Sequence, residues 1–147
     1  MIDLFCQNTA VGLATFLPVL RENVSRYGVA KYSEIDGAKH LDSIVEKPRV
    51  EDAPSNLINI SKYIFTPLVF DIIKRQKIEP RLNELLITDT VSELVKEGGV
   101  LLFETTGEYF DCGNLESWLQ TNIAIAMKDP VLREVVQNTV KKYTHDN

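Results

Sequence analysis

The dipeptide Asp36-Gly37 constrains the fold of this chain more than any other feature of its sequence. Asp-Gly favours a two-residue β-hairpin turn, because both central residues of such a turn adopt positive φ angles. The dipeptide stands between two segments with strand-like patterning, Tyr27–Tyr32 and Leu41–Val45. The sequence therefore predicts that these segments pair as antiparallel strands, with the first residues of one strand facing the last residues of the other.

The tripeptide Glu46-Lys47-Pro48 directly follows the second strand of this predicted hairpin. Proline cannot donate a hydrogen bond to a sheet, so the strand should end there, with Lys47 in an extended conformation. At a sheet rim, where the backbone turns, Glu46 and Lys47 could serve one ligand together. A carboxylate accepts hydrogen bonds from hydroxyl groups and an ammonium group binds phosphate, so the pair suits a sugar phosphate. The alternative is an exposed Glu–Lys pair at the start of a loop.

Gly28 lies near the start of the first strand of the hairpin, which the pairing places beside Glu46 and Lys47. A glycine at the start of a strand marks either a simple turn or a position where a ligand or another strand approaches the backbone closely. The predicted hairpin therefore brings these three residues together, and their convergence is the first argument for a binding site.

The rest of the chain alternates strand-like and helix-like segments, which is typical of an α/β protein. Further strands are expected at residues 9–20, 57–65 and 100–106, and a loop at residues 78–83. Helices are expected to start at Pro67, to span residues 115–128 and 131–143, and, between these, to follow a cap at Thr88 and stop at Gly98-Gly99. With 147 residues, no internal repeat and no linker, the chain is predicted to be a single domain.

Composition and charge narrow the classes of protein to which the chain can belong. With 44% hydrophobic and 25% charged residues it is predicted to be globular. The net charge of −5 gives no basic surface for nucleic acid, and no apolar run is long enough to cross a membrane. Two cysteines without a signal peptide indicate a reduced, cytoplasmic protein, and two histidines are too few for an imidazole metal cluster.

The tetrapeptide Asp111-Cys112-Gly113-Asn114 lies between an apolar segment and the expected start of a helix. A carboxylate in such a position can hold a divalent cation, because hard ions such as magnesium prefer oxygen ligands. Gly113 permits a tight turn, and Asn114 is a favoured residue immediately before a helix. The alternative is that Asp111 or Asn114 only caps the helix that follows.

Five short motifs occur along the chain in one order, and together they resemble a known family. The motifs are Arg26-Tyr27-Gly28-Val29, Val45-Glu46-Lys47-Pro48, Pro54-Ser55-Asn56-Leu57, Leu86-Ile87-Thr88-Asp89 and Phe110-Asp111-Cys112-Gly113-Asn114. This order resembles the C-terminal half of the bacterial-type UTP–glucose-1-phosphate uridylyltransferases, also called UDP-glucose pyrophosphorylases. The resemblance runs from about Thr9 to Met127, and the Asp-Cys-Gly-Asn form of the last motif is fairly specific to this family.

The resemblance implies a doubly wound, mostly parallel nucleotidyltransferase sheet, of which this chain would be the C-terminal part, with an antiparallel hairpin and C-terminal helices. It implies a reaction in which glucose 1-phosphate and UTP form UDP-glucose and pyrophosphate, with magnesium present. By motif, Gly28 and Glu46 resemble the residues that contact the sugar hydroxyl groups. Lys47 resembles the lysine that contacts the sugar phosphate, which makes it the candidate catalytic residue, and Asp111 resembles one of the magnesium ligands.

The sequence departs from the family at one important point. The family carries a glycine-rich loop that cradles the triphosphate, whereas none of the seven glycines of this chain forms a Gly-x-Gly motif. The resemblance therefore implies the sugar-binding half of a nucleotidyltransferase without the nucleotide-binding half, and a fragment that is inactive by itself. A non-catalytic sugar-phosphate-binding or oligomerisation module is the alternative.

The absence of half of the sheet also leads to an expectation about assembly. Strands at residues 9–20 and 57–65 are expected to have an unpaired edge, which is a template for pairing with another chain. The chain is therefore predicted to form a homo-oligomer or to associate with the missing half, and the family is itself oligomeric.

Overall fold

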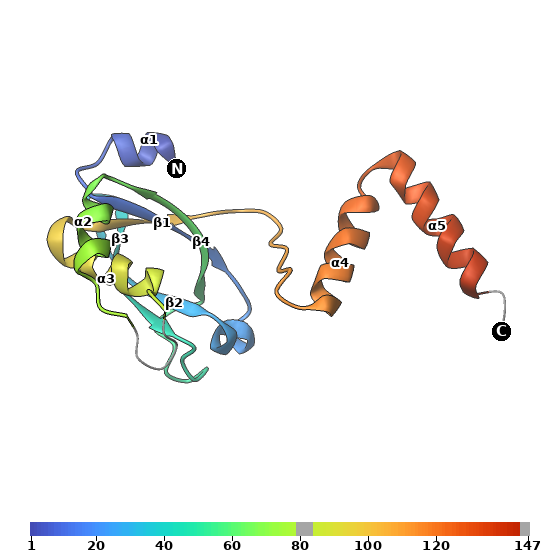
Figure 1. Cartoon of the computed structure of the whole chain (residues 1–147), viewed down its shortest axis with the longest axis horizontal. Helices are drawn as coiled ribbons and strands as arrows, with labels where there is room; N and C mark the ends of the chain where they lie inside the picture. Colours follow the sequence, from blue (N-terminus) through green and yellow to red (C-terminus); the bar gives the residue numbers. More distant parts are fainter. Residues whose placement is uncertain (79–83, 145–147) are drawn as a thin grey trace. The chain divides into compact units, whose positions relative to one another are not determined.

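The computed structural model describes residues 1–78 and 84–144, so most of the expected loop at residues 78–83 lies outside the described residues. The chain forms two compact units, Met1–Thr106 and Gly107–Asn147, which are described separately below (Figure 1). The expectation of a single domain over the whole chain stays a prediction.

The first unit is built around a closed barrel with the strand order β1-β4-β2-β3-β5 (Figure 1). The strands are β1 (Gly12–Pro18), β2 (Gly28–Ile35), β3 (Ala38–Glu46), β4 (Leu57–Phe65) and β5 (Val100–Glu104). The described residues of this unit also form the helical segments α1 (Ile2–Cys6), the 3-10 helix η1 (Arg21–Arg26), α2 (Leu68–Arg75) and α3 (Ile87–Gly98). The α/β content and the positions of the strands agree with the sequence analysis.

The expectation of a mostly parallel sheet is wrong for this chain. Among the described strands, β1 and β5 form the one parallel pair, and the other four pairings are antiparallel. The physical reason lies in the connections: a two-residue turn can join antiparallel strands only, whereas parallel strands need a long crossover. Here β2 and β3 are joined by the turn at Asp36-Gly37, and the long segment between β1 and β5 contains α2 and α3.

The predicted hairpin is confirmed. Asp36 and Gly37 have φ angles of 50° and 80°, as a two-residue hairpin turn requires. From this turn the pairing runs from Ile35 opposite Ala38 to Gly28 opposite Glu46, with one register shift between Lys31 and Tyr32. The turn therefore fixes which residues of β2 and β3 lie side by side.

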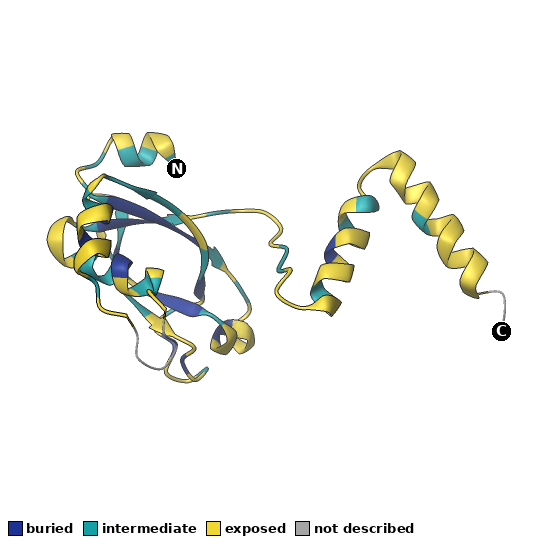
Figure 2. Ribbon diagram, in the orientation of Figure 1, coloured by how far each residue is buried: buried dark blue, intermediate teal, exposed yellow. Residues whose placement is uncertain are grey.

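Two apolar clusters form the core of the first unit, and Figure 2 shows the buried residues concentrated on the barrel strands. The larger cluster joins the strands to α2 and α3: Ala14, Phe16, Ala30, Leu41, Leu57, Val69, Ile72, Val91, Leu94, Val100 and Leu102. The smaller cluster joins η1 and the loop before β4 to the sheet: Val24, Val29, Ala53 and Ile58. Because Val29 and Ala30 belong to different clusters, β2 is covered on both faces.

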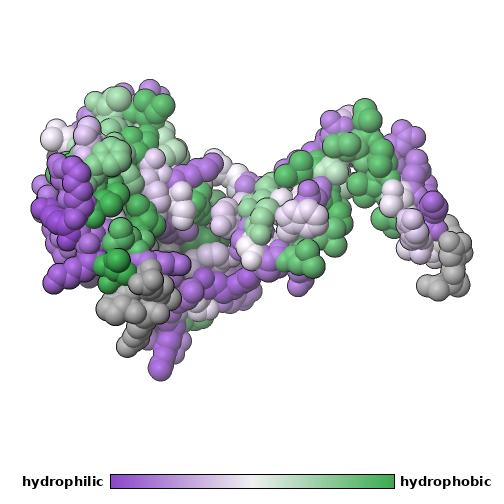
Figure 3. All heavy atoms as spheres, in the orientation of Figure 1, coloured by the Kyte–Doolittle hydropathy of each residue, from purple (hydrophilic) through white to green (hydrophobic). Residues whose placement is uncertain are grey.

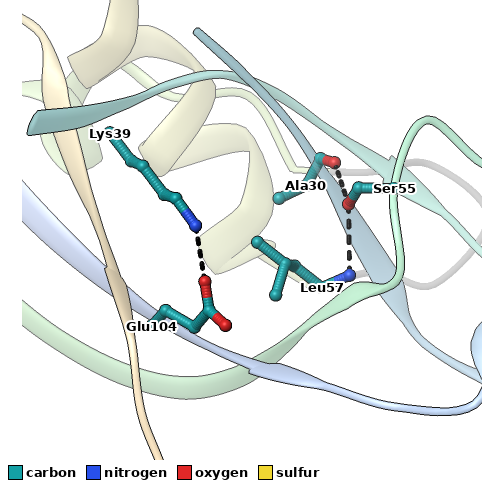
Figure 4. A network of polar contacts seen from close by, with 5 residues as sticks. All are labelled: Ala30, Lys39, Ser55, Leu57 and Glu104. Atoms are coloured by element: carbon teal, nitrogen blue, oxygen red, sulfur yellow. Dashed lines mark hydrogen bonds and ion pairs between the residues drawn. The ribbon is translucent and has the colours of Figure 1, made fainter. Parts of the chain in front are cut away.

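An ion pair between Lys39 and Glu104 ties β3 to β5 (Figure 4). The Lys39 Nζ atom donates to Glu104 Oε2 at 2.5 Å, and this hydrogen bond raises the pKa of the Lys39 ammonium group, while partial burial opposes the rise. Because the pKa of Lys39 is raised in the folded protein, the ion pair stabilises the fold at neutral pH, below the ordinary lysine pKa of about 10.4. This stabilisation is lost as the pH rises through the pKa that Lys39 has in the folded protein. Both side chains are partly exposed, so the pair contributes less than about 1 kcal/mol.

The expectation of unpaired edges on the first and fourth expected strands is also wrong. β1 pairs with β4 on one side and with β5 on the other, and β4 also pairs with β2 at Ile58. A closed barrel has no free edge, because its first and last strands pair with each other. Self-association through strand edges of this barrel is therefore not supported.

The second unit contains the helices α4 (Leu115–Ala126) and α5 (Pro130–Thr144), close to the two helices expected at 115–128 and 131–143. Many of their large apolar side chains are exposed, and Figure 3 shows apolar surface along both helices. The exposed residues are Leu115, Trp118, Leu119, Ile123, Ile125, Val131, Leu132, Val135, Val140 and Tyr143. None of the helices in the described part of the chain is long and apolar enough to cross a lipid bilayer.

The packing of α2 against the sheet predicts different effects for two neighbouring isoleucines. Ile72 is fully buried in the larger cluster, whereas the side chain of Ile73 is 37% exposed. Ile72→Ala should lower the free energy of unfolding by about 2–5 kcal/mol, because it leaves a cavity in the core. Ile73→Ala is the matched control and should have a clearly smaller effect in the same urea titration. Equal losses for the two variants would contradict the described packing.

Candidate functional site

Three residues from three strands form a row at the rim of the barrel, which we call the Gly28 row: Glu46 on β3, Gly28 on β2 and Asn59 on β4. Gly28 lies opposite Glu46 in the hairpin. On its other side Val29 pairs with Ile58, so the antiparallel register brings Gly28 beside Asn59. Residues that lie directly opposite each other share one face of a sheet. The Gly28 row therefore places a carboxylate and a carboxamide on the same face, on either side of a residue without a side chain.

Gly28 lies in a crowded position that has no room for a side chain. A Cβ atom at this position would lie 2.9 Å from Ile44 Cγ2, 3.0 Å from Glu46 Oε2 and 3.9 Å from Asn59 Cβ. The first two distances are too short for ordinary contacts, so a side chain at Gly28 would displace its neighbours. Glycine is thus required by the close approach of the Ile44 and Glu46 side chains, and the φ angle of Gly28 is not in the left-handed region.

Lys47 lies at the point where the chain leaves β3. Its backbone N–H donates to the carbonyl oxygen of Tyr27 at 3.0 Å, so the hairpin pairing continues one residue beyond Glu46. The φ angle of Lys47 is 45°, so the expectation of an extended conformation is wrong. A non-glycine residue in the left-handed region carries strain of about 1–2 kcal/mol. The backbone turns sharply here, which is the rim geometry that the joint use of Glu46 and Lys47 requires.

The side chains of Glu46 and Lys47 are both exposed. In the part of the chain that the structure describes, neither side chain takes part in an ion pair. Their exposure is compatible with the alternative interpretation, an exposed Glu–Lys pair at the start of a loop, so the choice between the two interpretations stays open. A carboxylate and an ammonium group remain available to a ligand at the rim.

The loop before β4 is held against β2 by the motif Pro54-Ser55-Asn56. The Ser55 hydroxyl donates to the carbonyl oxygen of Ala30 at 2.6 Å and accepts from the backbone N–H of Leu57 at 3.1 Å (Figure 4). The Asn56 side chain donates to the carbonyl oxygen of Val19 at 3.2 Å. These bonds fix the start of β4, and with it Asn59, against the strand that carries Gly28.

Asn59 and Tyr63 are polar residues that the sequence analysis did not single out. The Asn59 Nδ2 atom donates to the Tyr63 hydroxyl at 2.7 Å, and both side chains are half-buried. The available signal was Asn59 itself, because asparagine is depleted in strands and here stands inside the segment with the strongest strand propensity. A polar side chain in such a place needs a partner or a function.

Asp111 belongs to the second unit, in the segment before α4. Its Oδ1 atom accepts from the backbone N–H of Gly113 at 2.9 Å. The side chain of Asn114 accepts from the backbone N–H of Ser117 at 2.9 Å and caps α4. Capping therefore accounts for Asn114 and not for Asp111. The structure brings together Gly28, Glu46 and Lys47, whereas the position of Asp111 relative to them is not determined.

The chemistry of the described carboxylates bears on the expected magnesium ion. Among the described residues there is no group of three or more His, Cys, Asp or Glu side chains that could enclose a metal. Magnesium commonly binds through one or two carboxylates, with waters and substrate phosphates as its other ligands. One oxygen of the Asp111 carboxylate accepts from Gly113, and the chemistry of this carboxylate suits it to be one of the ligands of a magnesium ion that substrate phosphates also bind.

A comparison with models of protein families identifies the class of protein to which this fold belongs. The model of the family described as "Nucleotidyl transferase" matches residues 1–128. The chain belongs to this family.

Individual relatives give a narrower resemblance. The chain is 34% identical over 128 residues to the UTP–glucose-1-phosphate uridylyltransferase of Haemophilus influenzae. The alignment covers 84% of this chain and 43% of that protein. The apo structure of a UDP-glucose pyrophosphorylase superimposes with a TM-score of 0.77 at 32% identity, over 87% of this chain and 46% of the other. A UDP-glucose pyrophosphorylase in complex with UDP-glucose superimposes with a TM-score of 0.74 at 32% identity, over 86% and 48%.

These comparisons confirm the resemblance that the motifs predicted. They also show that the chain spans less than half the length of the relatives that it matches. The chain is thus similar to a part of a UDP-glucose pyrophosphorylase. The roles of Gly28, Glu46, Lys47 and Asp111 are not tested by these similarities and stay predictions.

Proposed function

We propose that this chain is the sugar-binding part of a UTP–glucose-1-phosphate uridylyltransferase, which makes UDP-glucose and pyrophosphate from glucose 1-phosphate and UTP. Its ligands are glucose 1-phosphate and UDP-glucose, and its setting is the cytoplasm. The relative that was solved with UDP-glucose supports a sugar nucleotide as the ligand class.

One observation carries the proposal: the Glu46 carboxylate lies directly over the position where Gly28 lacks a side chain. In the proposed complex the sugar lies at the rim against the Glu46 carboxylate, and its hydroxyl groups donate to Glu46. Lys47 follows at the turn of the chain, and its ammonium group binds the phosphate on the sugar.

Lys47 is the proposed catalytic residue. In the proposed reaction a phosphate oxygen of glucose 1-phosphate attacks the α-phosphorus of UTP, so two anionic substrates must come together. The ammonium group of Lys47 offsets part of this repulsion and orients the attacking phosphate. Magnesium, with Asp111 as one of its ligands, would supply further charge neutralisation for the phosphates.

The chain by itself is proposed to be inactive as a uridylyltransferase. It contains no glycine-rich loop for a triphosphate, and its relatives are more than twice as long as the matched region. The groups that bind UTP would come from a nucleotide-binding half, either a separate chain that associates with this one or the rest of a longer protein of which this chain is a piece.

A non-catalytic sugar-phosphate-binding or oligomerisation module is the second candidate, and the exposed apolar residues of α4 and α5 favour it. Exposed apolar patches of this kind often mark sites of protein–protein association. We therefore retain the proposal of a homo-oligomer and place its contacts on these helices rather than on strand edges.

A direct assay tests the proposed inactivity. With UTP, glucose 1-phosphate and magnesium, the chain should release no pyrophosphate above the level without protein. Loss of even one preorganised donor lowers kcat about 100-fold or more, and here the whole triphosphate cradle is missing. Pyrophosphate release that Lys47→Ala abolishes would contradict this expectation.

Titration calorimetry with glucose 1-phosphate tests the assignment of Lys47. Lys47→Ala should weaken binding about 10- to 150-fold, because a charge-assisted hydrogen bond contributes roughly 1.5–3 kcal/mol. Binding of glucose, which has no phosphate, should not change. Lys74→Ala, which removes an exposed lysine on α2, is the matched control and should leave both affinities as they are. Equal affinity of wild type and Lys47→Ala for glucose 1-phosphate would refute the role of Lys47.

A further inference from the structure

We propose that a groove beside β2 binds a phosphate ester that carries hydroxyl groups, at a place separate from the Gly28 row. The groove has a volume of about 990 Å³, which is within the range of small-molecule sites. Its walls come from the start of η1, from the middle of β2 and from the loop before β4. The polar side chains that carry the proposal are Arg21, Lys31 and Glu34.

The groove arises from the way in which β2 and β4 diverge. In the described ladder these strands pair at a single residue pair, Val29 and Ile58. Further along β2 the loop before β4 lies beside it, and the Ser55 hydroxyl donates to the carbonyl oxygen of Ala30 at 2.6 Å (Figure 4). Because a loop rather than a paired strand borders β2 here, a hollow lined by side chains remains next to the strand.

The groove is displaced along β2 from the proposed sugar site. Lys31 and Glu34 lie three and six residues beyond Gly28. At a rise of about 3.3 Å per residue these separations are roughly 10 and 20 Å. The side chain of Lys31 also points to the face of the sheet opposite to that of the Gly28 row, because successive residues of a strand alternate. The groove shares no residue with the Gly28 row or with Lys47, so its occupancy does not depend on the proposed function.

Two cationic side chains give the groove its affinity for phosphate. Arg21 Nη2 donates to the carbonyl oxygen of Ala53 at 2.8 Å, which fixes the guanidinium group and leaves its other N–H donors for a ligand. Lys31 is exposed, and among the described residues neither Lys31 nor Arg21 forms an ion pair. Guanidinium and ammonium groups bind phosphate oxygens through charge-assisted hydrogen bonds. The groove thus offers two unneutralised cations on a chain whose net charge is −5.

Glu34 makes the groove selective for an ester over a bare anion. Its carboxylate is exposed, and none of the ion pairs in the described part of the chain includes it. A carboxylate can only accept hydrogen bonds, so it binds hydroxyl groups and repels phosphate. A ligand that carries both groups satisfies Glu34 with its hydroxyls and the two cations with its phosphate. Inorganic phosphate satisfies the cations alone.

Nuclear magnetic resonance of the isotope-labelled chain tests the site with ribose 5-phosphate, inorganic phosphate and ribose as probes. Ribose 5-phosphate should shift the backbone amide resonances of Lys31, Ser55 and Asn56, which line the groove. Inorganic phosphate should bind more weakly at the same place, and ribose, which has no phosphate, should not bind measurably. Added salt should weaken the binding of both anions, because it screens exposed charges.

Two substitutions test the assigned contacts. Lys31→Gln should weaken ribose 5-phosphate about tenfold or more, because a charge-assisted hydrogen bond is lost. Lys62→Gln is the matched control, since Lys62 is also an exposed strand lysine that forms no ion pair among the described residues, and it should leave the affinity unchanged. Glu34→Gln should reduce the preference for ribose 5-phosphate over inorganic phosphate, because it weakens an acceptor for hydroxyl groups and removes a charge that repels phosphate.

Failure of the groove is distinguishable from failure of the sugar site. Shifts of the groove amides that persist in Lys47→Ala support the groove whether or not the rim binds a sugar. Shifts that are confined to the Gly28 row and Lys47, and that disappear in Lys47→Ala, would place the probe at the rim and overturn the groove assignment. It would also be overturned by equal affinities of Lys31→Gln and Lys62→Gln, by equal binding of ribose 5-phosphate and inorganic phosphate, or by the absence of any shift.

Discussion

The register of the β2–β3 hairpin is the constraint on which the rest of the candidate site depends. A two-residue turn at Asp36-Gly37 starts the pairing, and the last pair of the ladder joins Gly28 to Glu46. A shift by one residue would turn every side chain of one strand to the other face of the sheet. It would move the Glu46 carboxylate away from Gly28. The turn is thus far from the rim in sequence and still determines what the rim contains.

The hairpin and the pairing of Gly28 with Glu46 could be predicted from the sequence because both rest on local rules. Asp-Gly requires positive φ angles, Pro48 ends a strand, and alternating residues of two paired strands meet at known positions. The strand and helix positions followed from periodicity for the same reason. The capping role of Asn114 was among the alternatives, and the bond to Ser117 establishes it.

Barrel closure and the β4 bulge could not be predicted because they depend on contacts between distant segments. The antiparallel pairing of β1 with β4 and the closure through β5 are set by packing against α2 and α3, which no single segment reveals. The hydrogen bond between Asn59 and Tyr63 exists only because β4 gains residues relative to β1. The left-handed conformation of Lys47 opposes the usual preference before proline, so a local rule gave the wrong conformation at a rim residue.

The central claim is that the sugar binds at the Gly28 row beside the Glu46 carboxylate, and two glycine substitutions test it most directly. An added Cβ would crowd Ile44 Cγ2 at 2.9 Å and Glu46 Oε2 at 3.0 Å in Gly28→Ala, and Phe65 Cδ1 at 3.1 Å in Gly12→Ala. Both variants carry a similar overpacking penalty of about 1–3 kcal/mol, so their free energies of unfolding should fall comparably. Gly28→Ala should weaken UDP-glucose binding about tenfold or more, since it blocks the sugar and displaces a hydrogen-bond acceptor, whereas Gly12→Ala should leave binding unchanged. Equal UDP-glucose affinity in the two folded variants would contradict the account.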